Sequence, residues 1–250
     1  MRSTWILGWV AVLVLLAVGC GSEWSLPGKF GKVKGQVVDE GSGLGIKGVT
    51  VQCGGDIGFT DSSGLFELDE VAVGEQLLKV WKDGYVGIAH DQKSVKVIED
   101  TTTEAGKLKL AKVTNGAVLL DNLTPTGKDD MEIGARIFNG VTYEHTVHGS
   151  SYLNDNDAKM DFYINGKFNR FKATVGVDDL TPYTSLYYKF LVYVDGDKKA
   201  ELQLSEAHAL PIDLDVVNAK TLRLEIHCPD SVEGRKGGLY AGFGDARLVL

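Results

Sequence analysis

Six residues in the second half of the sequence combine aromatic rings with polar side chains in a way that suits sugar recognition. A pyranose ring offers apolar C–H faces to an aromatic plane and hydroxyls to polar groups, so a sugar site needs one exposed ring beside convergent polar side chains. Tyr240, in a glycine-rich stretch, and His148 fit such roles and packed structural roles about equally. The predicted sugar-binding residues are His148, Asp178, Asp179, Tyr183, Tyr240 and Phe243.

Other polar and aromatic residues of this segment have a simpler structural interpretation. Tyr187 and Tyr193 fit packed strand positions better than a binding site. A second polar group consists of every second residue of one predicted strand, so its side chains share one face, a pattern that favours a solvated surface. This group consists of Arg223, Glu225 and His227.

Asp178 and Asp179, together with the Asn/Asp run 154–157, raise the hypothesis of a structural calcium ion. Calcium takes about six to eight oxygen ligands, and carboxylates and amides supply them. The spacing is not that of an EF-hand loop, so the hypothesis depends on the fold bringing these residues together. No other cofactor is indicated.

The sequence lacks the common catalytic motifs. It has no nucleophile elbow, no HExxH zinc motif, no phosphate-binding loop and no paired-cysteine motif. His227 and Cys228 are neighbours, but adjacent strand residues point to opposite faces and cannot act as a dyad. We therefore predict that the protein is not an enzyme.

Composition limits the remaining classes of protein. The chain has 250 residues, 44% hydrophobic and 24% charged, with a net charge of -8. This is a globular composition, and its acidic balance argues against nucleic acid as a partner. Three cysteines are too few for a disulfide scaffold. Cys53 and Cys228 fall on the apolar phases of their strands, which favours buried free thiols, with a disulfide between them as the alternative.

The first residues have the pattern of an export signal. The apolar run 5–18 follows Arg2 and, at about 1.5 Å per residue, falls short of a hydrocarbon core of about 30 Å. It ends in small residues before Cys20, which resembles a bacterial lipobox and implies lipidation of Cys20. A cleaved ordinary signal peptide and an uncleaved anchor are the alternatives. Gly21 follows, so the aspartate that retains many lipoproteins at the inner membrane is absent.

After residue 30 the hydrophobic pattern has the period of two that is typical of strands. Glycine clusters interrupt it every eight to twelve residues or so, the rhythm of a β-sandwich. Residues 61–64 should form a tight hairpin, Trp81 and Tyr85 should fill the core or a sheet edge, and the Asp195-Gly196 pair should turn a second hairpin. The opening and closing apolar strands of the second segment, 117–120 and 246–250, should pair.

Residues 33–112 resemble the carboxypeptidase regulatory-like family. The resemblance rests on the motifs at 35–39, 45–51 and 60–66, and on KDGY at 82–85. It implies a small transthyretin-type sandwich that serves as a spacer, not as a peptidase.

Residues 116–250 resemble the NPCBM family of carbohydrate-binding modules, which are found attached to glycoside hydrolases such as family 98. The matching pieces include 120–125, 138–143, 147–150 and 244–248, and the most specific is RFKATVGVDD at 170–179. The resemblance implies a galactose-binding-like jelly roll. The sequence departs from the family at Phe243, where tryptophan is frequent, and in an insertion at 154–157.

Together these patterns predict an all-β protein of two domains: a transthyretin-like sandwich and a galactose-binding-like jelly roll, after a lipoprotein signal peptide. We expect a bacterial envelope lipoprotein, facing the periplasm or the cell surface, whose jelly roll binds carbohydrate, with galactose-type glycans favoured. The alternative is a structural or protein-binding envelope lipoprotein without sugar affinity. The expected boundaries are a signal peptide at 1–19, a lipidated Cys20 and tether at 20–31, the first sandwich at 32–113 and the jelly roll at 114–250.

Overall fold

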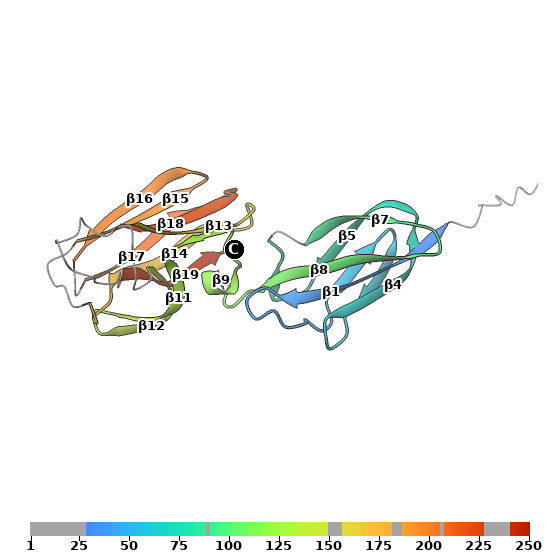
Figure 1. The fold of residues 1–250 in the computed structure, drawn as a ribbon, viewed down its shortest axis with the longest axis horizontal. Coiled ribbons are helices and arrows are strands. Elements are labelled where there is room, and N and C mark those ends of the chain that lie inside the picture. Colours follow the sequence, from blue (N-terminus) through green and yellow to red (C-terminus); the bar gives the residue numbers. More distant parts are fainter. Residues whose placement is uncertain (1–28, 89–90, 150–156, 182–186, 206–207, 228–240) are drawn as a thin grey trace, which may run out of the picture.

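The computed structural model describes residues 29–88, 91–149, 157–181, 187–205, 208–227 and 241–250. These residues form β-strands and one short 3-10 helix, so the predicted all-β fold is confirmed. The strands build two sandwiches that lie end to end (Figure 1). We call them the N-terminal sandwich, residues 30–112, and the C-terminal sandwich, residues 117–249.

The N-terminal sandwich consists of two four-stranded sheets, in the orders β4-β1-β8-β6 and β3-β2-β5-β7. All pairs are antiparallel except β1 with β8, which run parallel over most of their length. The strands are β1 (Phe30–Asp39), β2 (Thr50–Cys53), β3 (Asp56–Phe59), β4 (Leu65–Ala72), β5 (Gly74–Trp81), β6 (Tyr85–Val86), β7 (Gln92–Val97) and β8 (Thr102–Lys112).

Branched aliphatic side chains fill the core of the N-terminal sandwich. Val33, Val49 and Val51 are fully buried there, and Phe66 is the one phenylalanine of this cluster. Cys53 is also buried and free, and burial raises the pKa of its thiol to about 11, so it stays protonated and unreactive at neutral pH. Cys228, its alternative disulfide partner, lies outside the described residues.

The turn at residues 61–64 has the predicted chemistry but a different role. The Asp61 carboxylate accepts hydrogen bonds from the amides of Ser63 and Leu65, at 2.8 and 2.9 Å. Gly64 has a φ of 75°, and a Cβ there would lie 2.2 Å from a backbone oxygen. The flanking strands β3 and β4 belong to different sheets, so the turn carries the chain across the sandwich. The hairpin prediction was therefore wrong.

The C-terminal sandwich packs a five-stranded sheet, β10-β13-β18-β15-β16, against a six-stranded one, β11-β12-β19-β14-β17, in which β9 also pairs with β19. Two layers around one core are the architecture that a jelly roll requires. The elements are β9 (Ala117–Leu119), the 3-10 helix η1 (Leu120–Asn122), β10 (Gly127–Asp129), β11 (Met131–Phe138), β12 (Val141–Gly149), β13 (Asp157–Tyr163), β14 (Arg170–Val177), β15 (Tyr188–Val194), β16 (Asp197–Leu204), β17 (Ala209–Asp215), β18 (Thr221–His227) and β19 (Ala241–Val249).

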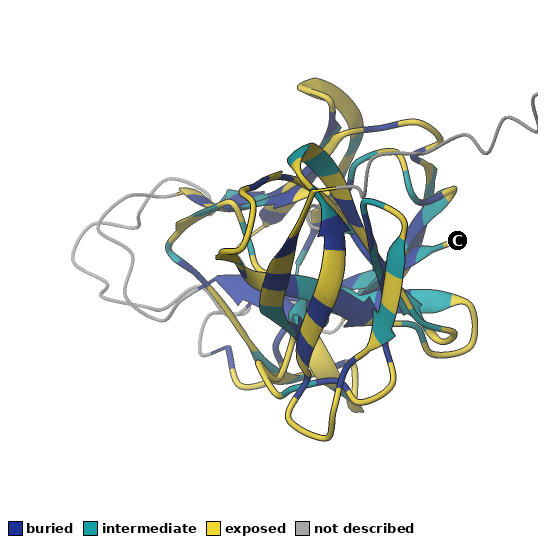
Figure 2. Cartoon of the chain, turned by 90° about the vertical axis from the view of Figure 1, so that its right-hand side faces the viewer, coloured by how far each residue is buried: buried dark blue, intermediate teal, exposed yellow. Residues whose placement is uncertain are grey.

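Sequence alternation positions these strands as predicted. Buried residues alternate with exposed or half-buried ones along β13 and β18, and the first strand of the sandwich pairs with the last, as Leu248 opposes Val118. The same alternation is visible in the N-terminal sandwich, which faces the viewer in Figure 2. At the Asp195-Gly196 turn both residues have positive φ and join β15 to β16, which confirms the predicted hairpin. The core is rich in aromatic rings, which are Phe162, Phe168, Phe171, Tyr188, Phe190 and Phe243.

The two sandwiches meet through an apolar and hydrogen-bonded junction. Ile88, after β6, is buried in the core cluster of the C-terminal sandwich, and its carbonyl accepts a 2.7 Å hydrogen bond from the Asn165 amide. Lys167 and Asp91 form a 2.9 Å ion pair nearby. These contacts tie the two bodies together.

The predicted signal peptide and Cys20 lie outside the described residues. Within the described ranges, no helix is long and apolar enough to cross a bilayer.

Candidate functional site

Three polar residues come together at the end of the C-terminal sandwich that faces away from the N-terminal one. His148 is near the end of β12, Arg136 is on β11, and Asp178 directly follows β14. The start of β19 marks the same end, because Gly242 pairs with His148 while Val249, at the far end of β19, pairs with Ala117. The sequence predicted His148 and Asp178 as neighbours in a site, and the fold does bring them together.

Arg136 connects the other two residues. Its Nη2 lies 3.1 Å from His148 Nδ1, and its Nε lies 3.4 Å from Asp178 Oδ2, an ion pair rather than a hydrogen bond. Nη1 donates to the carbonyl of Ala135 at 2.8 Å. A guanidinium carries five N–H donors, so several remain available. The side chain is 25% exposed, and Arg136 is therefore the member of the cluster that can reach a ligand.

His148 is held neutral. The side chain is buried, and this loss of solvation lowers its pKa below the ordinary value. The hydrogen bond to the Gly149 carbonyl opposes this decrease, and the positive charge of Arg136 adds to it. Nδ1 lies 2.8 Å from that carbonyl, and it either donates there or accepts from Arg136, depending on the tautomer. With Nδ1 unprotonated, the ring accepts from Arg136 and orients the guanidinium.

The two aspartates have positioning roles. Asp178 is buried, and its Oδ1 accepts a 2.9 Å hydrogen bond from the amide of Leu180. Asp179 accepts from the amides of Asn139 and Gly140, at 2.8 and 2.7 Å, and so holds the β11–β12 turn. Asp179 thus fixes the turn that follows the strand of Arg136, and Asp178 places a negative charge beside the guanidinium.

The same contacts bear on the calcium hypothesis. The carboxylate oxygens of Asp178 and Asp179 point at N–H donors, and the Arg136 guanidinium already supplies the positive charge beside Asp178. Within the described ranges no group of three or more His, Cys, Asp or Glu side chains is placed to hold a metal ion. This arrangement does not fit a calcium site at the two aspartates. Residues 154–156 of the polar run lie outside the described residues.

Phe243 does not offer its ring to a ligand, and this prediction was wrong. The residue is fully buried and contacts Phe190 edge-on, with ring centroids 5.7 Å apart. The reason is that β19 is an interior strand between β12 and β14, and the Phe243 side chain points into the core between the sheets. The other predicted rings, Tyr183 and Tyr240, lie outside the described residues.

Sequence reasoning missed Arg136. The signal was present, because Arg136 is the one basic residue of β11 and follows Gly134 and Ala135, two small residues. A Cβ at Gly134 would lie 3.4 Å from His148 Nε2, so the glycine leaves room beside the imidazole. A basic side chain next to small residues on a strand could have indicated a site.

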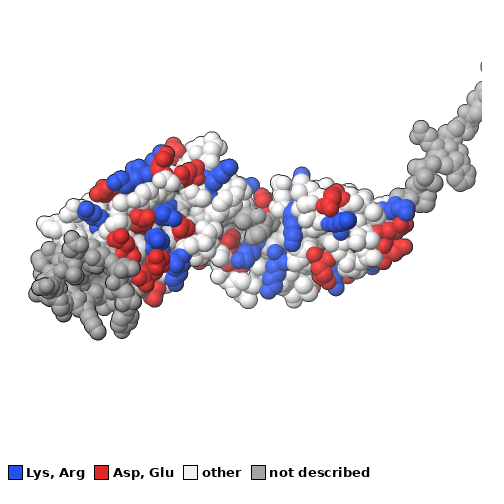
Figure 3. Space-filling view, turned by 45° about the horizontal axis from the view of Figure 1, so that its top comes forward, with Lys and Arg blue, Asp and Glu red and all other residues white. Residues whose placement is uncertain are grey.

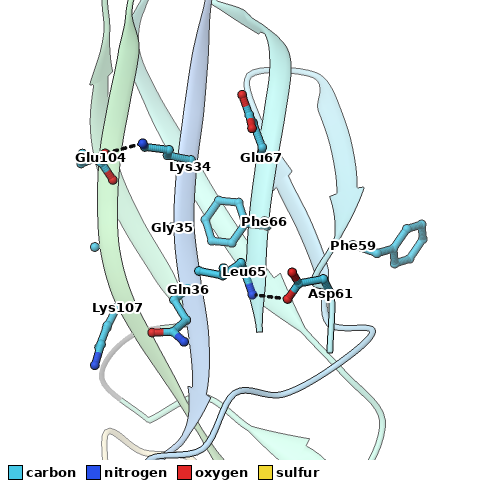
Figure 4. A pocket seen from close by; sticks show the side chains of 11 residues that line it. Lys34, Gly35, Gln36, Phe59, Asp61, Leu65, Phe66, Glu67, Glu104 and Lys107 are labelled. Atoms are coloured by element: carbon cyan, nitrogen blue, oxygen red, sulfur yellow. Dashed lines mark hydrogen bonds and ion pairs between the residues drawn. The ribbon is translucent and has the colours of Figure 1, made fainter. Parts of the chain in front are cut away.

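Two hollows lie outside the cluster of Arg136, His148 and Asp178, one on each sandwich. A polar cavity of about 420 Å³ on the outer face of β18 includes Arg223, Glu225 and Tyr193, and Arg223 is paired with Asp161 at 2.6 Å. A second hollow, of about 610 Å³, lies on the outer face of the β4-β1-β8 sheet and contains the Lys34–Glu104 ion pair (Figure 4). Acidic and basic side chains are interspersed over the face of the molecule in Figure 3.

Comparison with known proteins gives a family for the C-terminal sandwich. A family model described as NPCBM/NEW2 domain matches residues 101–249, which comprise β8 and the C-terminal sandwich. No curated protein matches the chain.

Among solved structures, the chain is similar to the CBM51 domain of Clostridium perfringens GH95 in complex with methyl-galactose, with 16% identity and a TM-score of 0.43 over 53% of this chain and 99% of that chain. It is also similar to the CBM51-2 and INT domains of Clostridium perfringens ZmpB in complex with GlcNAc, with 17% identity and a TM-score of 0.44 over 87% of this chain and 48% of that chain. A third is BcpA, the major pilin subunit of Bacillus cereus, with 15% identity and a TM-score of 0.31 over 83% and 61%.

Proposed function

The chain belongs to the NPCBM/NEW2 domain family, and we propose from this membership that its C-terminal sandwich is a non-catalytic carbohydrate-binding module. The observation that carries the proposal is the cluster of Arg136, His148 and Asp178 at the free end of this sandwich.

The chemistry of the cluster suits a sugar. A partly exposed guanidinium can donate to two neighbouring hydroxyls, and a buried carboxylate and a neutral imidazole keep it in place. Because the positive charge is balanced by Asp178, the cluster favours a neutral polyhydroxyl ligand over an anion. We propose galactose-type glycans, whose axial hydroxyl projects from the ring toward such a donor.

The rest of the chain completes this proposal. Cys20 would carry the lipid anchor, and the N-terminal sandwich, as a carboxypeptidase regulatory-like spacer, would hold the module away from the membrane. The module would then face the periplasm or the surface of a bacterial cell. The junction at Ile88 and Asn165 supports a spacer role, since it limits the freedom of the two bodies.

One observation favours a second function, that of a structural or protein-binding envelope lipoprotein. Phe243 is buried, and the cluster of Arg136, His148 and Asp178 itself has no exposed ring on which a sugar could stack. A module of this kind would bind a protein partner of the envelope.

A glycan array with the full chain separates the two functions. We expect binding to galactose-type glycans and a loss of roughly tenfold or more in affinity for Arg136→Ala, as for a charged hydrogen-bond donor of about 1.5–3 kcal/mol. Arg170→Ala is the matched control, because Arg170 is an arginine of the same sandwich that pairs with Asp213 at the surface. Equal melting temperatures would show that both variants fold. Silence on the array, with a protein retrieved from envelope extracts, would support the second function.

A further inference from the structure

Two exposed aromatic side chains flank strand β2 on the outer face of the N-terminal sandwich. Phe59 on β3 is 68% exposed and Trp81 on β5 is 46% exposed. Both are paired with the same residue, Thr50 of β2, so the three side chains form one row across the sheet. The sequence predicted Trp81 at the core or a sheet edge, but β5 lies between β2 and β7 and turns Val80, not Trp81, inward.

The next row of the same face is polar. Gln52 of β2 pairs with Ile57 on one side and with Lys79 on the other, and Lys79 pairs with Gln92 of β7. Within the described part of the chain, none of the side chains of Thr50, Gln52 and Gln92 forms a hydrogen bond. An aromatic row therefore lies beside a row of free hydroxyl and amide groups.

The stability of the fold does not explain these rings. The core beneath them is closed by Val51 and Val80, which are buried. Exposed aromatic side chains that gather on one face typically mark a binding surface. Phe59 also stands at the margin of the hollow in Figure 4, where its ring projects away from the other labelled side chains.

Charge and spacing indicate the kind of partner. The aromatic row is uncharged, and Lys79 is the one charged side chain in the two rows, so the face matches a neutral polar ligand better than an acidic or basic protein. Strands two apart in a sheet are separated by about 10 Å. In an extended β-1,4-linked glycan every second pyranose ring presents the same face, at a comparable repeat.

We propose that the face formed by Phe59, Thr50 and Trp81 is a second carbohydrate-binding site, for an extended neutral β-1,4-linked pyranose chain. Alternate sugar rings stack on Trp81 and Phe59, and the side chains of Gln52 and Gln92 bond to hydroxyls along one edge of the chain. This site lies in the N-terminal sandwich and does not depend on the function proposed for Arg136.

Tryptophan fluorescence provides the test, and comparison with Trp81→Ala separates the signal of Trp81 from that of the three tryptophans at positions 5, 9 and 24. The full chain is titrated with cellohexaose and with chitohexaose, which separate glucose-type from N-acetylglucosamine-type chains, and binding is also followed by calorimetry. We expect a saturable fluorescence change that is lost in Trp81→Ala, and a decrease in affinity of roughly tenfold in Phe59→Ala, equivalent to about 1.4 kcal/mol.

Two controls make the result specific. Leu77→Ala removes another exposed apolar side chain of β5, outside both rows, and should leave binding unchanged. Arg136→Ala should leave this fluorescence change intact even where it abolishes binding to the array. Absence of binding to both oligosaccharides would overturn the proposal. So would self-association of the chain, measured by sedimentation, that Trp81→Ala abolishes, because the face would then be a contact between two copies.

Discussion

The two sandwiches place their aromatic rings in opposite ways. The C-terminal sandwich buries Phe171, Phe190 and Phe243 between its sheets, and the predicted site at its end consists of charged and polar groups. The N-terminal sandwich is filled with valine and leucine and shows Phe59 and Trp81 to solvent. The same residue type thus stabilises one body and forms a surface on the other.

The difference teaches that strand position, not residue type, decides what an aromatic ring does. Both residues lie on interior strands, but the Phe243 side chain points into the core and the Trp81 side chain points to solvent. Substitution of the buried Phe243 should therefore reduce stability, whereas substitution of the exposed Trp81 should reduce binding and leave stability nearly unchanged.

Phe243→Ala should have the largest effect. Removing a fully buried phenylalanine leaves a cavity and costs about 3–5 kcal/mol of unfolding free energy. Phe59→Ala, the matched change at a 68% exposed position, should cost less than about 0.5 kcal/mol. Chemical denaturation followed by circular dichroism measures both, and equal losses would refute the assignment of Phe243 to the core.

Ile88→Ala should come next, because it acts on both bodies at once. Ile88 belongs to the core cluster of the C-terminal sandwich, and its truncation should cost about 2–4 kcal/mol. Since it also joins the bodies, we expect a single thermal transition in the natural chain and two transitions in the variant, measured by calorimetry. Val95→Ala, in the core of the N-terminal sandwich alone, is the control.

Thr60→Val should have an intermediate effect confined to the N-terminal sandwich. The buried Thr60 hydroxyl accepts a 2.9 Å hydrogen bond from the amide of Val49 and donates to the carbonyl of Ile46. Valine has the same shape but leaves both backbone groups unpaired, at a cost of about 1–3 kcal/mol. Thr60→Ser, which keeps the hydroxyl, should recover most of the loss in urea unfolding. A valine variant as stable as the natural chain would contradict this.

The pH dependence from His148 should be the smallest effect. Its pKa is lower in the folded protein than the ordinary 6.5, so between the two values the unfolded chain binds more protons. The contribution of His148 to the free energy of unfolding is therefore fully present above pH 6.5. It decreases as the pH falls toward the pKa of the folded state and levels off below that pKa. Melting temperatures between about pH 7.5 and pH 5 should show a smaller decrease for His148→Gln than for the natural chain. An equal decrease would mean that other groups dominate.

Local pattern predicted much of the fold and part of the site. Alternation predicted the buried face of β14, and the Asp195-Gly196 pair predicted a hairpin, because both signals act over a few residues. The turn at 61–64 shows the limit of local prediction. Its hydrogen bonds and its glycine were predicted correctly, but pairing with distant strands decides which sheet each flanking strand joins. Phe243 was misplaced because its burial depends on which strands are neighbours in the finished sheet, whereas Arg136 was missed although the small residues before it gave a local signal.

The parallel pairing of β1 with β8 has a mechanical consequence. The chain enters the molecule at the start of β1 and leaves for the C-terminal sandwich at the end of β8, and these two points lie at opposite ends of the ladder. Tension applied between them therefore slides the two strands past each other and loads their hydrogen bonds together instead of one at a time. Any force between the C-terminal sandwich and residue 30 is therefore carried by this shear-resistant pair.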